Sequence, residues 1–293
     1  MKFIANISMC DPTFYVPLAQ AAEEAGFDTI AVPDSIAYPQ ESSSTYPYNF
    51  DGTREFLENK PFIEPTVAIA AMAAVTSTIE FHTFVLKMPI RHPVIYAKEA
   101  TSLAAMSGNR FVLGVGASPW PDDYEIVQLP WAGRGRRFDE CIEIVRGLAA
   151  GGYFEYHGEF YDFPAIKMEP VPTERLPVLI GGHGDAQLRR AARLGDGWMG
   201  AGGMLDDLVP MIDRMNDLRQ EHGRAGERFD IYATTPESFT VDGIKQLEDL
   251  GVTHTAGGFG RFNPYGLDTD PESLQEKIDN LRRHGDEVIS KLR

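Results

Sequence analysis

A glycine-containing turn carries the residue types and spacing that most clearly suggest chemistry. Residues 177–200 read PVLIGGHGDAQLRRAARLGDGWMG, which predicts a short buried strand, a turn and a helix that begins near Asp185. The turn contains three glycines and one histidine: Gly181, Gly182, His183 and Gly184. A helix start offers unpaired N–H groups and a positive dipole end, and glycines let a phosphate approach the backbone. A tight turn that needs a positive φ explains the glycines equally well.

Two other predicted strands also end in residues that could contact a ligand. The strand at 110–116, RFVLGVG, finishes with Gly114 and Gly116. The run AVPDS places Asp34 at the end of the strand at 28–32, where a carboxylate could bond a ligand N–H or orient a neighbour. A turn-capping role for Asp34 is nearly as good an explanation.

The histidines and arginines divide into structural and functional candidates. His82 lies within the strand at 79–87, on the opposite face from Phe81 and Thr83, and we interpret it as structural. Residues 132–138, AGRGRRF, begin a predicted helix with three arginines: Arg134, Arg136 and Arg137. Cations are slightly unfavourable at a helix start, which indicates either anion binding or pairing with carboxylates. Arg261, after the last predicted strand, is a better-placed candidate for an anionic substrate.

Composition and missing motifs exclude several classes of protein. The formal net charge of −16 makes nucleic acid an unlikely partner. Cys10 and Cys141 form neither a disulfide framework nor a zinc pattern, and we expect no metal. No signal peptide, apolar run of membrane-spanning length, nucleophile elbow or ATPase-type phosphate loop is present, so we expect a cytoplasmic enzyme and no membrane partner.

The elements that must position these residues alternate along the whole chain. Strands are predicted at 3–7, 28–32, 79–87, 110–116, 178–182, 195–200, 229–233 and 252–256, each followed by a helix. The last helix is expected to have Asp270 as its N-cap and Pro271 as its first residue. Eight strand–helix units predict one (β/α)8 barrel over residues 1–293, with a doubly wound open sheet as the alternative. A long loop at about 35–61 and an irregular aromatic insertion at about 153–172 interrupt the alternation.

Three stretches resemble one family of oxidoreductases. They are AQAAEEAGFDTIAVPDS, then RHPVIYAKEATSLAAMSGNRFVLGVGAS at 91–118, then GEFYDF followed by PVPTERLPVLIGGHGDAQLRRAARLGDGWMG. Together they resemble the bacterial-luciferase-like flavin and deazaflavin oxidoreductases over about residues 1–255. The resemblance implies a barrel with an insertion, and binding of coenzyme F420 or, alternatively, FMN.

The resemblance also implies where the cofactor binds. The ring would lie against a bulge that often holds a non-proline cis peptide, which falls here at Phe84–Val85. Two turns would hold the phosphate, and their residues are Gly116, Ala117, Ser118, Gly181, Gly182, His183, Gly184 and Asp185. The chain departs from the family where the bulky Phe84 stands. Ser35 and Pro119 replace a histidine and a glutamate of the sugar-phosphate dehydrogenases, which argues against proton abstraction from an alcohol.

We therefore expect an F420-dependent oxidoreductase that transfers hydride to or from a small organic substrate. An FMN-dependent luciferase-like monooxygenase is the alternative, and a non-catalytic flavin-binding protein is a further one. Asp34 and Ser35 would contact the ring or the substrate, and Arg261 would contact an anionic substrate. The substrate pocket would be shaped and covered by the loop at 35–61 and by Tyr46, Tyr48 and Trp120. A homodimer is possible.

Overall fold

Eight parallel strands close into a barrel in the computed structural model, which describes residues 1–48, 52–258 and 272–293. The strands are β1 (Lys2–Asn6), β2 (Thr29–Val32), β3 (Glu80–Thr83) continued by β4 (Leu86–Lys87), β5 (Phe111–Gly116), β8 (Val178–Gly181), β9 (Gly197–Met199), β10 (Asp230–Tyr232) and β11 (His254–Gly257). They pair in the order β2-β1-β11-β10-β9-β8-β5, and β3 pairs with both β2 and β5. The closed ring confirms the predicted (β/α)8 barrel and excludes the open sheet.

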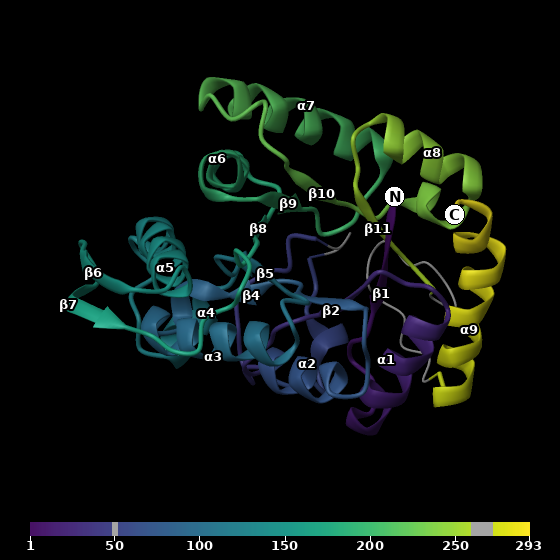
Figure 1. Ribbon diagram of the computed structural model, residues 1–293, viewed down its shortest axis with the longest axis horizontal. Helices are drawn as coiled ribbons and strands as arrows, with labels where there is room; N and C mark the ends of the chain where they lie inside the picture. Colours follow the sequence, from purple (N-terminus) through teal and green to yellow (C-terminus); the bar gives the residue numbers. More distant parts are fainter. Residues whose placement is uncertain (49–51, 259–271) are drawn as a thin grey trace.

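One helix follows each barrel strand and packs on the outside of the ring (Figure 1). These helices are α1 (Tyr15–Glu24), α2 (Pro65–Ala73), α3 (Pro93–Met106), α5 (Arg134–Ala149), α6 (Asp185–Leu194), α7 (Leu205–Glu221), α8 (Val241–Asp249) and α9 (Leu274–Glu287). Pro65 and Pro93 are first residues of their helices, where the missing N–H costs nothing. The main hydrophobic core fills the space between strands and helices, and a smaller apolar cluster fills the barrel interior.

The side-chain alternation in β3 follows the prediction. Phe81 belongs to the core between the barrel and the helices, whereas His82 lines the barrel interior and is fully buried. This alternation decides which residues of each strand can reach a ligand at the barrel mouth.

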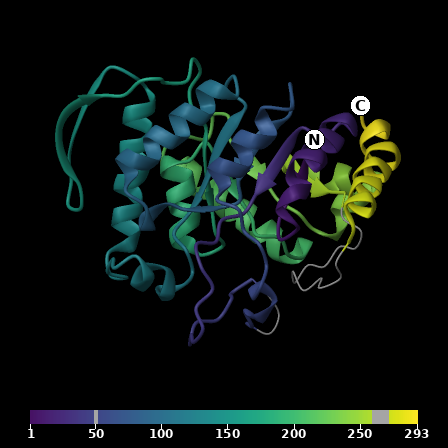
Figure 2. The ribbon, with the colours of Figure 1, turned by 90° about the horizontal axis from the view of Figure 1, so that it is seen from below.

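Three details of the sequence-based prediction are wrong. A short helix, α4 (Pro121–Ile126), lies in the stretch expected to be loop. The insertion, expected to be irregular, is an antiparallel strand pair, β6 (Tyr153–His157) and β7 (Asp162–Lys167), that extends beyond the barrel (Figure 2). Helix α9 begins at Leu274 with Ser273 and Glu276 as a capping box, so Asp270 and Pro271, which lie outside the described residues, do not cap it.

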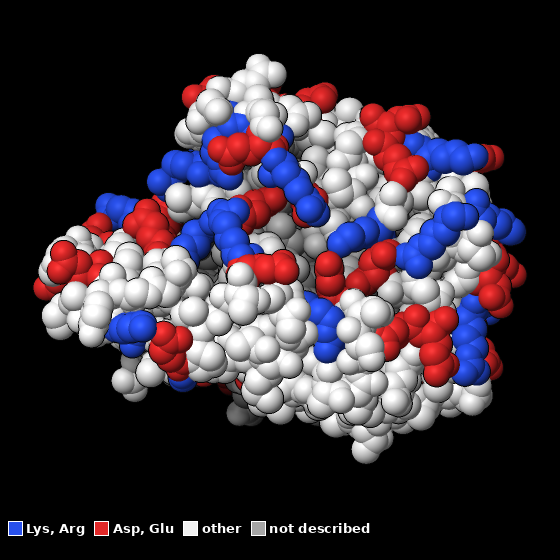
Figure 3. Space-filling model, in the orientation of Figure 1, with Lys and Arg blue, Asp and Glu red and all other residues white. Residues whose placement is uncertain are grey.

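Charged side chains are spread unevenly over the surface. The face over α2 and α3 carries few charges in the view of Figure 3, and Val67 and Ile95 are exposed on these helices. The possible homodimer stays a prediction.

No helix within the described residues combines the length and apolarity that a membrane span requires.

Candidate active site

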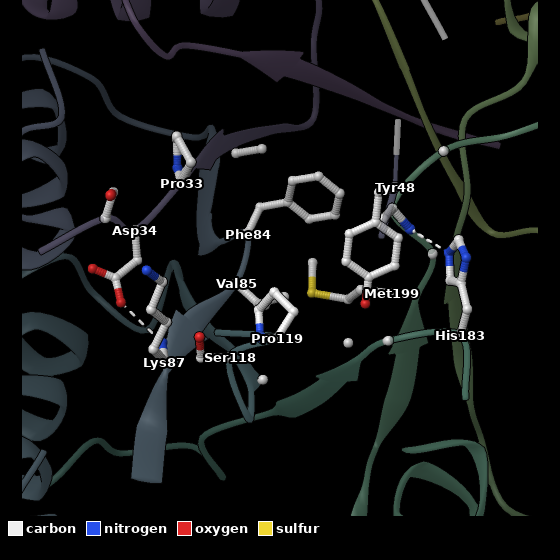
Figure 4. A pocket seen from close by; sticks show the side chains of 18 of the residues that line it. Pro33, Asp34, Tyr48, Phe84, Val85, Lys87, Ser118, Pro119, His183 and Met199 are labelled. Atoms are coloured by element: carbon white, nitrogen blue, oxygen red, sulfur yellow. Dashed lines mark hydrogen bonds between the residues drawn. The ribbon is translucent and has the colours of Figure 1, made fainter. Parts of the chain in front are cut away.

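A cavity of about 620 Å³ opens at the carboxyl ends of the barrel strands (Figure 4). That volume suits a cofactor or a substrate of moderate size. The structure brings fourteen of the predicted site residues to its walls: Asp34, Ser35, Tyr46, Tyr48, Phe84, Val85, Gly116, Ala117, Ser118, Trp120, Gly181, Gly182, His183 and Gly184. Asp185 is absent from the walls, and Arg261 lies outside the described residues.

The Phe84–Val85 peptide forms an apolar shelf on one wall of this cavity. The peptide bond is cis, which confirms the position that the resemblance implied. The Val85 side chain fills the space between two strand ends. A Cβ atom at Gly116 would lie 2.6 Å from one of its methyl groups, and a Cβ atom at Gly181 would lie 2.7 Å from the other. Glycine is therefore required at both positions so that Val85 can lie between them.

Asp34 holds the strand segment that follows this shelf. Its carboxylate accepts two hydrogen bonds from the Arg91 guanidinium, at 2.7 and 2.8 Å, and a third from the Lys87 backbone N–H at 2.8 Å. Arg91 also donates to the Lys87 carbonyl oxygen at 3.2 Å. The Asp34 side chain is only 2% exposed. Its charge is thus committed to fixing the backbone of β4, although the residue lines the cavity.

A buried ion pair lies beside the predicted phosphate turn after β5. The Lys87 ammonium lies 2.8 Å from an Asp123 carboxylate oxygen, and the two side chains are 7% and 3% exposed. Asp123 also accepts a hydrogen bond from the Ser118 hydroxyl, and Ser118 has a φ of 59°. The pair was not predicted, because Asp123 belongs to α4, which was expected to be loop.

Aromatic side chains from the segment between β2 and α2 form another part of the cavity wall. The Tyr46 ring lies 5.8 Å from the Trp120 ring and 5.4 Å from the Phe56 ring, measured between centroids. Arg54 anchors the segment, because it lies 4.1 Å over Trp120 and pairs with Asp122 at 3.2 Å. Burial raises the pKa of Tyr46 to about 12, so its hydroxyl stays protonated at neutral pH.

His183 links two turns at the far end of the cavity. Its Nε2 accepts a hydrogen bond of 2.8 Å from the Ala201 backbone N–H, so in the neutral ring the proton is on Nδ1. The Tyr48 ring packs against it, with centroids 5.1 Å apart. Burial lowers the pKa of His183, which favours this neutral form. Asp185 instead points outward and pairs with Arg189 and Arg214.

His82 lies deep in the barrel interior below the shelf. Its Nδ1 lies 2.8 Å from the Thr29 hydroxyl oxygen, and the Phe84 and Tyr232 rings pack edge-on against it. Complete burial lowers the pKa of His82 to about 3. The imidazole is therefore neutral at physiological pH.

The walls fit a flat cofactor that bears a phosphate. The shelf offers an apolar surface for a ring, and a Cβ at either neighbouring glycine would displace Val85 from it. Gly184, the N-cap of α6, lines the cavity, and no side chain caps the start of this helix. Two cationic residues, Lys87 and Arg134, are among the described residues that line the cavity.

A closed (β/α)8 barrel whose large cavity lies at the carboxyl ends of its strands has the architecture of a barrel enzyme. The sequence model of the luciferase-like monooxygenases matches residues 9–254, and the chain belongs to that family.

Two relatives match over most of this chain. An uncharacterized protein of Mycobacterium tuberculosis (strain ATCC 25618 / H37Rv) is 55% identical over 292 residues, which cover 100% of both chains. The F420-dependent glucose-6-phosphate dehydrogenase of Gordonia bronchialis is 30% identical over 259 residues, which cover 85% of this chain and 71% of that protein.

Two solved structures share the fold at low identity. The coenzyme F420-dependent tetrahydromethanopterin reductase of Methanopyrus kandleri has a TM-score of 0.76 at 16% identity and covers 100% of this chain and 99% of that chain. A monooxygenase of Streptomyces bottropensis has the same TM-score at 17% identity and covers 100% of both chains.

Proposed function

We propose that the protein is an F420-dependent oxidoreductase that acts on a small organic substrate. The observation that carries the proposal is the shelf, where Val85 lies between Gly116 and Gly181 on the wall of a 620 Å³ cavity. The F420-dependent dehydrogenase of Gordonia bronchialis supports this choice of cofactor, because it is 30% identical over 85% of this chain.

The chain's own residues would hold and orient the cofactor. Phe84 and Val85 would support the ring, and the turns at 116–118 and 181–184 would hold the phosphate with backbone N–H groups. When bound, F420 supplies the hydride chemistry, and the protein supplies placement and electrostatics. Asp34 would act by fixing β4 through Lys87, since its carboxylate already accepts three hydrogen bonds.

The residues at positions 34, 35 and 119 favour reduction of a substrate over oxidation of an alcohol. Abstraction of a proton from an alcohol needs a free base, and Asp34 is already paired with Arg91. Ser35 and Pro119, which also line the cavity, supply no base. Burial raises the pKa values of Tyr46 and Tyr48, so both would remain hydroxyl donors for a carbonyl oxygen.

FMN-dependent monooxygenation is the second candidate function. Two observations favour it: the description of the family as luciferase-like monooxygenases and the Streptomyces bottropensis monooxygenase with a TM-score of 0.76. The same shelf and turns would hold the ring and the phosphate of FMN.

Titration of the purified protein with F420 and with FMN, followed by fluorescence quenching, separates the two candidates. We expect F420 to bind at micromolar concentration or below and FMN to bind more weakly. Failure to bind F420 at micromolar levels would rule out the first function. Micromolar binding of FMN alone would favour the monooxygenase.

A further inference from the structure

The three arginines at the start of α5 have three different environments. Arg136 is 70% exposed and pairs with Glu159 at 2.8 Å. Arg137 is buried, donates to the Pro130 carbonyl oxygen at 3.0 Å and lies over the Phe160 ring. Arg134, by contrast, lines the cavity. Pairing with a carboxylate therefore explains Arg136, and anion binding stays a prediction for Arg134.

Arg134 is unusual among the arginines of this acidic protein. Across residues 1–48, 52–258 and 272–293, every other arginine donates a hydrogen bond or forms an ion pair through its guanidinium, and Arg134 does neither. The sequence has 43 acidic residues, so potential partners are abundant. An unpaired, half-buried cation on a cavity wall is the expected arrangement for a group that receives an anion from solution.

The Trp131 ring fixes the orientation of this guanidinium. The Arg134 Cζ lies 3.6 Å from the ring centroid, close enough for stacking. Stacking occupies a face of the planar guanidinium and leaves its in-plane N–H groups free. Those N–H groups match two oxygens of a phosphoryl or carboxylate group, which they can bind in a bidentate manner.

Further contacts connect Trp131 and Arg134 to the turn after β5 and to helix α6. The Tyr124 ring packs edge-on against Trp131 at 5.0 Å, and the Tyr124 hydroxyl donates to the Ala117 carbonyl oxygen in the turn after β5. On the other side, Arg190 of α6 donates to the Gly135 carbonyl oxygen at 3.0 Å. The residues around Arg134 are thus linked to the turn after β5 and to α6, the helix that follows the turn at 181–184.

We propose that Arg134, stacked on Trp131, is an anion-binding site at the cavity wall that takes a phosphoryl or carboxylate group of a ligand. The anionic group can belong to the cofactor or to the substrate, and the same chemistry serves both. If it belongs to the cofactor, the assignment rests on the proposed function. If it belongs to an anionic substrate, the assignment does not depend on the proposed function.

Arg134→Met tests the site, because methionine keeps an unbranched side chain and removes the charge. Arg136→Met is the matched control, since Arg136 lies on the same helical turn and is exposed. Fluorescence quenching gives the affinities of F420 and FMN, each compared with its phosphate-free form, the bare deazaflavin chromophore or riboflavin. Calorimetry with inorganic phosphate provides an arm that needs no cofactor.

If Arg134 binds the cofactor, Arg134→Met should weaken binding of the phosphate-bearing form at least tenfold. The affinity for the phosphate-free form should change less than twofold. A substrate site predicts unchanged cofactor affinities and loss of the inorganic phosphate binding that the wild-type protein shows. Arg136→Met should match wild type throughout. Equal weakening of both forms, or no change with any ligand, would overturn the proposal. If the wild-type protein binds inorganic phosphate but neither F420 nor FMN, the proposed function is refuted. The effect of Arg134→Met on phosphate binding then decides whether Arg134 is the anion-binding site.

Discussion

Asp34 shows what residue types alone could and could not reveal about the site. Its position after a predicted strand placed it correctly at the barrel mouth. Its partner could not be predicted, because Arg91 is 57 residues away in the sequence and meets it only in the folded barrel. The predicted catalytic role of Asp34 stays a prediction, and its contacts indicate that it positions the shelf.

Replacement of Asp34 by alanine should destabilise the protein strongly. Loss of one member of a buried ion pair leaves Arg91 unpaired and costs about 3–5 kcal/mol of unfolding free energy. Urea denaturation measures the loss. Asp185→Ala is the control, because the exposed Asp185 pairs with Arg189 and Arg214 at the surface and should matter little. Similar small effects of the two substitutions would contradict the positioning role.

At the scale of elements, local patterns predicted the barrel well. Helix α6 matches its predicted bounds at 185–194, because a strong apolar stripe and a glycine on either side define it locally. Helix α4 was missed because its six residues are too few to show a helical period. The β6–β7 hairpin was missed because its register shifts between Phe154 and Tyr156, which hides the alternation of a strand pair.

The shelf was predicted only in part. The resemblance to the family implied a cis peptide at Phe84–Val85, and the structure has one there. The sequence could not show that Gly116 and Gly181 both make room for Val85, because three separate strands meet at that point. Glycines that looked like turn residues are therefore also packing residues.

At the scale of the whole molecule, three buried histidines link stability to pH. Burial lowers the pKa of His82 to about 3, that of His254 to about 2 and that of His284 to about 4. An unfolded histidine has a pKa of about 6.5, so between these values the unfolded chain binds more protons than the folded one. The stability contributed by the neutral forms is thus complete above pH 6.5 and decreases as the pH falls.

Acidification should therefore unfold the protein well above the pH at which carboxylates titrate. At pH 5 each of the three histidines contributes a loss of about 2 kcal/mol, or about 6 kcal/mol together, which is comparable with a typical total stability. Urea denaturation between pH 7.5 and 5 measures the slope. His284→Gln should reduce the slope by about a third, and the exposed His222→Gln should leave it unchanged. A flat profile in wild type would contradict this account.

The most direct test of the central claim, that the cavity holds the phosphate of F420 at the start of α6, is the affinity of two variants of Gly184. Gly184 lines the cavity and is the N-cap of α6, with a φ of −69° that any residue can adopt. Both Asn and Asp are favoured N-caps, so both variants should fold, and only aspartate adds a negative charge. Because the Asn side chain can accept hydrogen bonds from the same N–H groups that would hold the phosphate, we predict that Gly184→Asn binds F420 less tightly than wild type. Gly184→Asp should bind it at least tenfold more weakly, a difference of about 1.4 kcal/mol. Equal affinities of the two folded variants, or no binding by the wild type, would contradict the claim.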